Sequence, residues 1–548
     1  MNSRTDSKNP NRSTPSSRTV HPLLVAAFPA LFLYATNISQ FSLDVLMVPV
    51  LVLVASAAAL WALLGLALRS ARKAALIVSL FFLLLFSFGH ASSALPQYTW
   101  VIWVFWIGPN KTVFAVWTLL LLLGTWFSVR TKRDLQVLTR IVNVSAIVLV
   151  AISLFHITSY EMWSRGSSND ARESGAADED LVATRRPDRL PDIYWIVVDA
   201  YAREDVLKQL YGYDNSGFIA YLREDKGFYV ADRSTSNYCF TSLALPTTLN
   251  MTYLDAFLPE LDPEVNNNVF LMRRFFVENR LIRFLKKQGY RTIAFSSGYV
   301  ITEVPGYDEY LTPGWFYDEF QNALLDMTPA GTLFARMSRD EKWRTRLHFM
   351  FDGLGALAGR RSPKFVFAHF QSPHRPFVFG PHGEPVSAPH LWPPTGVTWI
   401  GPNEIDDYRR YYTGELTYVN TRLRQTIDTI LERSDPKPVI ILQGDHGPCS
   451  LLADPQNPTD AAIRERFPIL NAYYLPGGRY EGLRPDITPV NSFRVVLNHL
   501  FGTKQELLEN RNFYCTLEKL FKLTDVTETV RSGSSRTPPT RPKREIPR

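Results

Sequence analysis

The strongest constraint on this chain is a series of long apolar segments within its first 160 residues. Runs such as LDVLMVPVLVLVASAAALWALLGLAL and AALIVSLFFLLLFSFGHA contain almost no charge. Each is close to the roughly 20 residues that a helix needs to cross the hydrocarbon core of a bilayer. We therefore expect the front of the chain to be a bundle of membrane-spanning helices.

The hydropathy pattern predicts five spans, at residues 21–38, 43–68, 74–90, 112–129 and 139–158. The first follows about 20 polar residues and lacks a small-residue cleavage pattern, so we expect a retained anchor. Between the third and fourth spans, residues 98–108 place Trp100, Trp103 and Trp106 at near-helical spacing. That spacing predicts an aromatic helix lying in the outer interface.

Basic residues indicate the orientation of the spans. They cluster in the N-terminal tail, in residues 69–73 and in residues 130–133. Positively charged loops stay on the cytoplasmic side, and all three clusters can do so with an odd number of spans. The chain after the last span is then exported.

The formal net charge of +7 does not indicate nucleic-acid binding. The excess of Lys and Arg lies in residues 1–20, in the short loops between spans and in residues 526–548, and the segment after the last span is net acidic. Both terminal segments have the composition of disordered tails. We expect no nucleic-acid partner.

A polar linker over residues 161–190 leads into a second domain, residues 191–525, beyond the transmembrane domain of residues 21–160. Short apolar runs rich in β-branched and aromatic residues alternate there with helical stretches. The runs are residues 192–200, 291–297, 364–370, 438–447 and 468–477. This alternation predicts an α/β domain with a central, mostly parallel sheet between helices.

Polar side chains end several of these runs, and ligands of such sheets bind at the carboxyl ends of the strands. Asp199 ends the first run, while Asp445 and His446 end the fourth. His369 lies near the end of the third run and His374 shortly after it, so all five can share one crevice. An adjacent carboxylate and imidazole suit zinc or manganese; the alternative for Asp199 and for Asp445 is an ordinary strand-end turn.

The segment SNYCFTSLALPTTLNM, residues 236–251, is rich in hydroxyls and shows no clear helical or strand period. A plain loop is one interpretation. A nucleophile is the other, because direct metal coordination is one of the few ways to activate a Thr hydroxyl without a neighbouring base.

Together these motifs resemble the alkaline phosphatase and sulfatase superfamily, specifically its membrane-anchored branch. The chain looks like the phosphoethanolamine transferases and the lipoteichoic acid synthases, which also have five membrane helices before an exported α/β domain. TSLALP, residues 241–246, matches their T-x-x-S-L-P pattern with Ala244 in place of Ser. The resemblance therefore selects Thr241 as nucleophile.

The same resemblance implies a divalent metal held by Asp199, Thr241, Asp445 and His446, with Asp199 standing where those families usually have Glu. Zinc or manganese is expected, with magnesium or calcium as alternatives. The segment HFQSPHRPF, residues 369–377, matches a family pattern that brings His374 to the transferred group, and His369 is assigned to substrate binding with it. The stretch 412–431 resembles the family helix that precedes the D-H pair.

Two further features depart from the family patterns. Sulfatases convert a Cys or Ser in C-x-P-x-R to formylglycine, whereas Cys239 begins CFTSL, so we do not expect that modification. The transferases carry a further histidine after the D-H pair; here Arg466 or Arg464 is a candidate for oxyanion binding instead. His382 lies in a Pro/Gly-rich loop that could cover the site. The three cysteines are too scattered to predict a disulfide framework.

The function implied by the resemblance is transfer of a phosphoethanolamine or phosphoglycerol group to a cell-envelope lipid or glycan through a covalent Thr intermediate. A membrane lipid is the expected donor, and the bacterial inner membrane, with a periplasmic catalytic domain, is the expected location. The alternatives are a sulfatase or phosphodiesterase using the same site, and a non-catalytic scaffold in surface-polysaccharide assembly.

Overall fold

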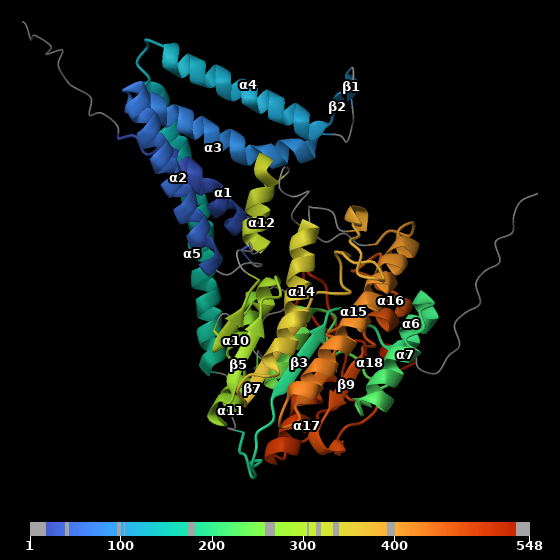
Figure 1. Ribbon diagram of the computed structural model, residues 1–548. Helices are drawn as coiled ribbons and strands as arrows, with labels where there is room; N and C mark the ends of the chain where they lie inside the picture. Colours follow the sequence, from blue (N-terminus) through green and yellow to red (C-terminus); the bar gives the residue numbers. More distant parts are fainter. Residues whose placement is uncertain are drawn as a thin grey trace, which may run out of the picture. The chain divides into compact units, whose positions relative to one another are not determined.

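The computed structural model describes residues 18–38, 43–95, 100–102, 105–173, 181–257, 269–303, 306–313, 319–331, 339–391 and 400–532. The chain forms two compact units, Met1–Trp163 with Phe320–Arg336, and Ser164–Glu319 with Met337–Arg548 (Figure 1). The tails predicted at the two ends fall outside the described residues up to residue 17 and from residue 533, as does part of the linker, residues 174–180.

The first unit is built from apolar helices. They are α1 (His21–Thr36), α2 (Asp44–Leu68), α3 (Ala71–Ala94), α4 (Pro109–Arg130) and α5 (Gln136–Glu173). Four are long and apolar enough to cross a membrane, namely α2, α3, α4 and the Gln136–Tyr160 part of α5; α1, with 16 residues, is shorter. The predicted helical membrane part is confirmed, and α5 continues into the segment expected to be linker.

The two basic loops lie at the same end of this unit. Lys73, at the start of α3, donates from Nζ to the carbonyl oxygens of Val129 (2.9 Å) and Thr131 (3.0 Å) at the end of α4. Arg72 pairs with Asp134, between α4 and α5, at 3.7 Å. The α2–α3 turn and the α4–α5 loop therefore face one side, as the charge pattern requires.

The aromatic helix predicted for residues 98–108 is wrong. Two short strands occur instead, β1 (Trp100–Ile102) and β2 (Phe105–Ile107), and they pair antiparallel with Trp100 opposite Ile107. Val, Ile, Trp and Phe make up this run, and β-branched and aromatic residues favour extended backbone over helix. Trp103 lies outside the described residues.

A segment expected in the catalytic domain packs among the membrane helices of the first unit. The Phe320 ring, on α12 (Glu319–Asp326), lies edge-on to Tyr34 at 6.4 Å. The Gly89 N–H donates to the carbonyl oxygen of Met327 at 2.9 Å. A Cβ at Gly89 would lie 2.5 Å from the carbonyl oxygen of Asp326, so only glycine permits this approach.

A seven-stranded sheet is the centre of the second unit, in the order β4-β9-β8-β3-β7-β5-β6. The parallel strands are β3 (Ile193–Val198), β5 (Arg291–Phe295), β6 (Glu309–Leu311), β7 (Lys364–Phe370) and β8 (Val439–Gln443). At one edge β9 (Asn471–Tyr474) and β4 (Tyr229–Val230) pair antiparallel. The predicted, mostly parallel sheet is confirmed.

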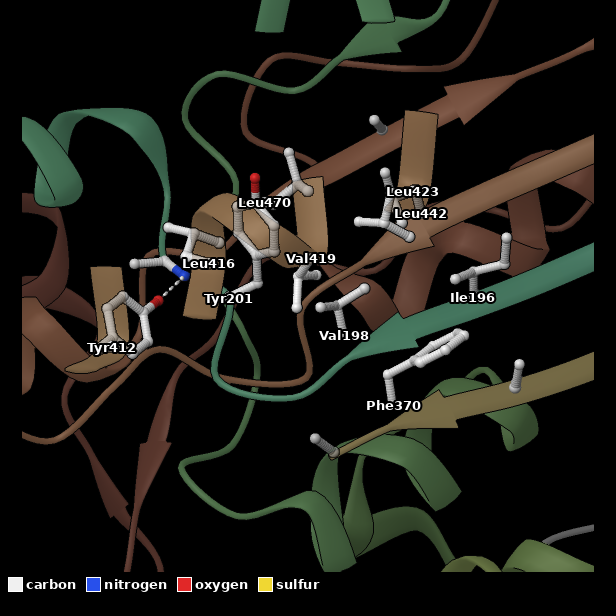
Figure 2. Close-up of a cluster of buried hydrophobic side chains, with 14 of the residues drawn as sticks. Ile196, Val198, Tyr201, Phe370, Tyr412, Leu416, Val419, Leu423, Leu442 and Leu470 are labelled. Carbon is white, nitrogen blue, oxygen red and sulfur yellow. Dashed lines mark hydrogen bonds between the residues drawn. The ribbon is translucent and has the colours of Figure 1, made fainter. Parts of the chain in front are cut away.

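Helices cover both faces of this sheet. The even-numbered residues of β3 enter a cluster with α14 (Arg339–Leu357) and α15 (Ile405–Arg433), part of which Figure 2 shows. The odd-numbered residues pack against α11 (Arg280–Lys287) and α17 (Pro489–Phe501). Burial on both faces explains why β3 reads as an unbroken apolar run rather than an alternating one.

Smaller elements surround this core. They are α6 (Glu204–Tyr211), α7 (Ser216–Ala220), a π-helical turn (Tyr221–Asp225), α8 (Thr241–Asn250), α9 (Leu254–Phe257), α10 (Phe270–Val277), α16 (Asp460–Arg466), β10 (Phe513–Tyr514), β11 (Thr524–Asp525) and α18 (Thr527–Ser532). The start of the predicted C-terminal tail is ordered, because the Asn512 N–H donates to Thr527 Oγ1 (2.9 Å) and Val530 is buried.

A buried ion pair joins the start of β7 to the residue before β3. Lys364 and Asp192 are both 1 % exposed, their charged groups are in contact, and the Lys364 N–H also donates to Asp192 Oδ1 at 3.1 Å.

Replacing Lys364 with Met leaves the Asp192 carboxylate buried without its partner. We expect the free energy of unfolding to fall by about 3–5 kcal/mol. Urea unfolding measures the change, with Lys437→Met, a substitution at an exposed lysine, as the control. An unchanged unfolding midpoint in Lys364→Met would contradict the prediction.

Candidate active site

The first strand of the site ends in a strained turn. Asp199 follows β3, and Ala200 has a φ of +61°, a left-handed conformation that costs a non-glycine residue on the order of 1 kcal/mol. Two hydrogen bonds hold it: the Ala200 N–H donates to Asp445 Oδ1 (3.1 Å), and the Tyr412 hydroxyl donates to the Ala200 carbonyl oxygen (2.8 Å). Tyr412 also accepts the N–H of Ala202, the dashed line in Figure 2. The turn thereby holds Asp199 beside the loop that carries Asp445.

Thr241 is the first residue of helix α8, not part of a loop. The hydroxyls that suggested a loop are satisfied inside the helix, because Thr247 Oγ1 donates to the Leu243 carbonyl oxygen and Thr248 Oγ1 to that of Ala244, both at 2.7 Å. Phe240 before it is extended, so the helix begins at Thr241. This position places the Thr241 hydroxyl at the positive end of the helix dipole.

Thr241 contacts both members of the D-H pair. Its Oγ1 donates to Asp445 Oδ2 at 2.6 Å and lies 3.3 Å from His446 Nε2. All three side chains are buried, and Asp445 and His446 follow β8 after one residue, Gly444. Thr241 and the D-H pair, more than 200 positions apart in sequence, thus form one cluster.

Asp199 and His369 complete this cluster from β3 and β7. His446 Nε2 lies 3.6 Å from Asp199 Oδ1, and His369 Nε2 lies 3.5 Å from Asp199 Oδ2. The metal-competent atoms of Asp199, His369 and Asp445 all lie within 4.8 Å of one another. Asp199 Oδ1 and His369 Nε2 are fully buried and have no hydrogen-bond partner among the described residues.

Burial dominates the pKa values of this cluster. Burial and the neighbouring Asp199 raise the pKa of Asp445 to about 7. Burial likewise raises the pKa of Asp199. Burial lowers the pKa of His369 to about 4 and that of His446 well below its usual range. Two buried carboxylates beside neutral imidazoles are what a divalent cation requires of its ligands.

Hydrogen bonds also set the histidine tautomers. His446 Nδ1 faces the Gly447 carbonyl oxygen at 3.0 Å, and His374 Nδ1 faces that of Arg375 at 2.6 Å. A carbonyl oxygen only accepts, so each Nδ1 carries the proton and each neutral ring keeps a lone pair on Nε2. His446 Nε2 points at Thr241, as a metal ligand would.

The residues present therefore fit a divalent metal, and Asp199, Thr241, Asp445 and His446 would hold it, as the family resemblance implied. His369 joins this group: the sequence suggested it for substrate binding, but its place beside Asp199 favours metal binding. Carboxylate, imidazole and hydroxyl donors suit zinc or manganese. The individual roles remain predictions.

Arg466 ties the nucleophile segment to the metal-binding loop. Its Nε and Nη2 donate to the Cys239 carbonyl oxygen at 2.9 and 2.6 Å, and its Nη1 donates to that of Gly447 at 2.7 Å. A Cβ on Gly447 would lie 2.3 Å from the Glu465 carbonyl oxygen, so the loop can come this close only with glycine there. Arg466 holds Thr241 and His446 together through backbone; its predicted contact with substrate stays a prediction.

His374 and His382, which were predicted to bind substrate, are not among the residues that would hold the metal. The partly exposed His374 ring has its centroid 6.2 Å from that of His446, at the edge of the cluster where a transferred group could reach it. His382 is exposed in a turn, where its N–H donates to Glu384 Oε2 at 2.8 Å. Among the described residues no hydrogen bond, ion pair or ring contact joins His382 to the cluster, and its substrate contact remains a prediction.

The Sulfatase family profile matches residues 191–482, more than half of the chain. The chain belongs to the sulfatase family. Membership confirms the predicted superfamily and identifies the chain as a sulfatase-superfamily enzyme. The match begins at the residue where the sequence predicted the sulfatase-like domain to begin.

Solved structures give similarities of fold. The C-terminal periplasmic domain of EcEptC from Escherichia coli, in complex with Zn, is 12% identical, covering 63% of this chain and 95% of its own, with a TM-score of 0.42. The lipooligosaccharide phosphoethanolamine transferase A (EptA) of Neisseria meningitidis is 15% identical over 87% and 94%, with a TM-score of 0.37. The lipoteichoic acid synthase LtaP of Listeria monocytogenes is 14% identical over 63% and 83%, at 0.36. No curated protein gave a significant match.

A buried carboxyl group positions the His374 loop of this sulfatase-family domain. Glu415, on α15, accepts hydrogen bonds from Ser372 Oγ (2.5 Å) and from the N–H groups of Val378 (2.6 Å) and Phe379 (3.3 Å). These donors flank His374 on both sides. Burial raises the pKa of Glu415 from 4.5 to about 7.

This shift predicts a pH dependence of stability. The folded state keeps the Glu415 proton up to pH about 7, whereas the unfolded state loses it near 4.5. The group's stabilisation is therefore fully present below pH about 4.5 and is lost as the pH rises through about 7. Relative to Glu415→Gln, the free energy of unfolding of the wild type should fall by on the order of 3 kcal/mol across this window. Urea unfolding of both proteins at several pH values measures it, and parallel profiles would contradict it.

Proposed function

We propose that the chain transfers a phospho-linked head group, of the phosphoethanolamine or phosphoglycerol type, from a membrane lipid to a hydroxyl of a cell-envelope lipid or glycan. One observation carries the proposal: the Thr241 hydroxyl lies at the start of α8, 2.6 Å from Asp445 and 3.3 Å from His446. A buried hydroxyl held against metal-competent groups is suited to act as a nucleophile.

A divalent cation bound there would lower the pKa of the Thr241 hydroxyl and offset negative charge on the transferred group. The chain's residues orient the reaction. The hydrogen bond to Asp445 fixes Thr241 Oγ1, and the positive end of α8 favours negative charge at that oxygen. His374, whose Nδ1 donates to the Arg375 carbonyl oxygen, would in its protonated form donate from Nε2 to an oxygen of the transferred group.

The proposed reaction has two steps. In the first, Thr241 Oγ1 bonds to phosphorus while the bond from phosphorus to the donor's alcohol oxygen breaks, and that alcohol leaves with a proton. In the second, an acceptor hydroxyl bonds to phosphorus while the bond to Thr241 Oγ1 breaks, and Thr241 regains a proton. In-line displacement at phosphorus of this kind depends mainly on positioning and on charge stabilisation.

We place the catalytic domain on the extracytoplasmic side of a bacterial inner membrane. The basic α2–α3 turn and α4–α5 loop lie at one end of the helical unit, which the positive-inside rule assigns to the cytoplasm. Helix α5 then crosses to the opposite side before the catalytic domain begins. A membrane-tethered site of this kind can reach a lipid donor.

Hydrolysis is the second candidate, because with the same metal site and nucleophile water can replace the acceptor hydroxyl. The full chain, incubated with lipid carrying a labelled phosphoethanolamine or phosphoglycerol head group in dodecyl maltoside, distinguishes the two. Our proposal predicts labelled, phosphate-linked maltoside as the main product. Release of free head-group phosphate alone, or turnover of p-nitrophenyl sulfate alone, would show a hydrolase.

A further inference from the structure

Two cysteines far apart in sequence meet beside the nucleophile. Cys239 Sγ and Cys515 Sγ lie 3.7 Å apart, although 276 residues separate them. Both are buried, with exposed fractions of 1% and 2%. The Cys515 N–H also donates to Cys239 Sγ at 3.3 Å, so the two residues approach through backbone as well as side chain.

Neighbouring backbone contacts hold this approach in place. Tyr238, directly before Cys239, forms a parallel bridge with Phe513 of β10, and the Phe513 N–H donates to the Asn237 carbonyl oxygen at 2.8 Å. The two segments therefore run side by side into the cysteines. A disulfide at this point needs the sulfurs to close the remaining gap by side-chain rotation and small shifts.

We propose that Cys239 and Cys515 form a disulfide that fastens the segment preceding Thr241 to the C-terminal part of the domain. This inference rests on the extracytoplasmic placement in the proposed function, because disulfides persist in oxidising compartments. The two thiols lose two protons and two electrons to form the S–S bond. The acceptor is the disulfide of a thiol–disulfide exchange enzyme or a small-molecule disulfide. It takes up the two electrons and two protons and is reduced to two thiols.

The position gives the crosslink a role in the active site. Cys239 lies two residues before Thr241, and its carbonyl oxygen accepts two of the Arg466 hydrogen bonds that hold the nucleophile segment to Gly447. A bond from Cys239 to the C-terminal segment restrains this segment from a second direction. Cys449, the third cysteine, instead has its Sγ 3.9 Å from the Tyr408 hydroxyl, and no contact between Cys449 and another cysteine is seen among the described residues. It is the internal control.

Thiol counting on the full chain, purified from bacterial membranes without reductant, tests the proposal. The protein is denatured, alkylated, reduced and alkylated with a second, heavier reagent before peptide mass spectrometry. We expect the first label on Cys449 only, and the second label on Cys239 and Cys515. The first label on all three cysteines would overturn the proposal.

Variants give a second readout. Dithiothreitol should lower the thermal unfolding midpoint of the wild type and of Cys449→Ser by on the order of 5 °C. Cys515→Ser should unfold at the lower temperature with or without dithiothreitol; a dithiothreitol effect that persists in Cys515→Ser would also overturn the proposal.

A membrane-impermeant amine label applied to intact spheroplasts reports separately whether the domain is extracytoplasmic. Free thiols in an externally labelled domain defeat the disulfide alone, whereas free thiols without external labelling defeat it together with the proposed placement.

Discussion

Replacing Thr241 with alanine is expected to reduce turnover by at least ~10³-fold while leaving the domain folded. The change removes the hydroxyl and the small γ-methyl group, and the hydrogen-bond partner Asp445 keeps the bond from the Ala200 N–H. Loss of a nucleophile removes the covalent step itself, so residual activity should approach that without enzyme. Initial rates on a head-group-labelled lipid, with the thermal unfolding midpoint of each variant, measure the effect.

Thr248→Ala is the matched control. Thr248 lies on the same helix and is also buried, and its hydroxyl donates within the helix, to the Ala244 carbonyl oxygen. Its removal should leave turnover within a few-fold of the wild type. Thr241→Ser, which keeps a hydroxyl, should retain much more activity than Thr241→Ala. Comparable activity in Thr241→Ala and Thr248→Ala would exclude Thr241 as nucleophile.

Replacing Asp445 with asparagine is expected to abolish tight metal binding and to lower turnover by a similar factor. Asparagine keeps the side-chain shape but removes one of the two charges that the cation neutralises. In the wild type, saturating zinc or manganese should raise the thermal unfolding midpoint, because ligand at about 100 times its Kd adds about 2.7 kcal/mol. The variant should show no such rise.

The control for this prediction is Asp454→Asn, an exposed carboxylate in the same domain. Metal affinity of the wild type should also weaken as the pH falls below about 7, because the proton that binds Asp445 must leave before the cation binds. Metal content is measured by elemental analysis after dialysis. Equal metal content in Asp445→Asn and Asp454→Asn would contradict the assigned ligand set.

The sequence predicts the sheet and the strand-end residues well, for a physical reason. Strands of a parallel sheet that are buried on both faces must be almost wholly apolar, so β3 and β8 are visible as unbroken runs. The polar residues that end them, Asp199 and Asp445, then have to meet at one edge. Thr241 follows from its motif alone, since nothing in its own segment indicates which hydroxyl faces the site.

Other features depend on tertiary contacts that no local pattern shows. The hydroxyl-rich sequence of α8 suggested a loop. In the helix the hydroxyls of Thr247 and Thr248 donate to carbonyl oxygens one turn earlier, and the sequence does not show these hydrogen bonds. The proximity of Cys239 and Cys515, and the link from Arg466 to Gly447, appear only once distant segments have folded together. The sequence also does not show where a side chain has no room. Gly89 looks like an ordinary residue of an apolar helix, but the backbone at Met327 packs directly against it.

The covalent step through Thr241 is tested most directly by trapping its adduct. The full chain, incubated with phosphatidylethanolamine and phosphatidylglycerol vesicles without acceptor and then quenched in acid, is digested and analysed by mass spectrometry. Our account predicts a phospho-linked head group on Thr241 in the wild type, which disappears when acceptor is added and is absent from Thr241→Ala. An adduct on another residue, or turnover with no adduct under any quench, would contradict it.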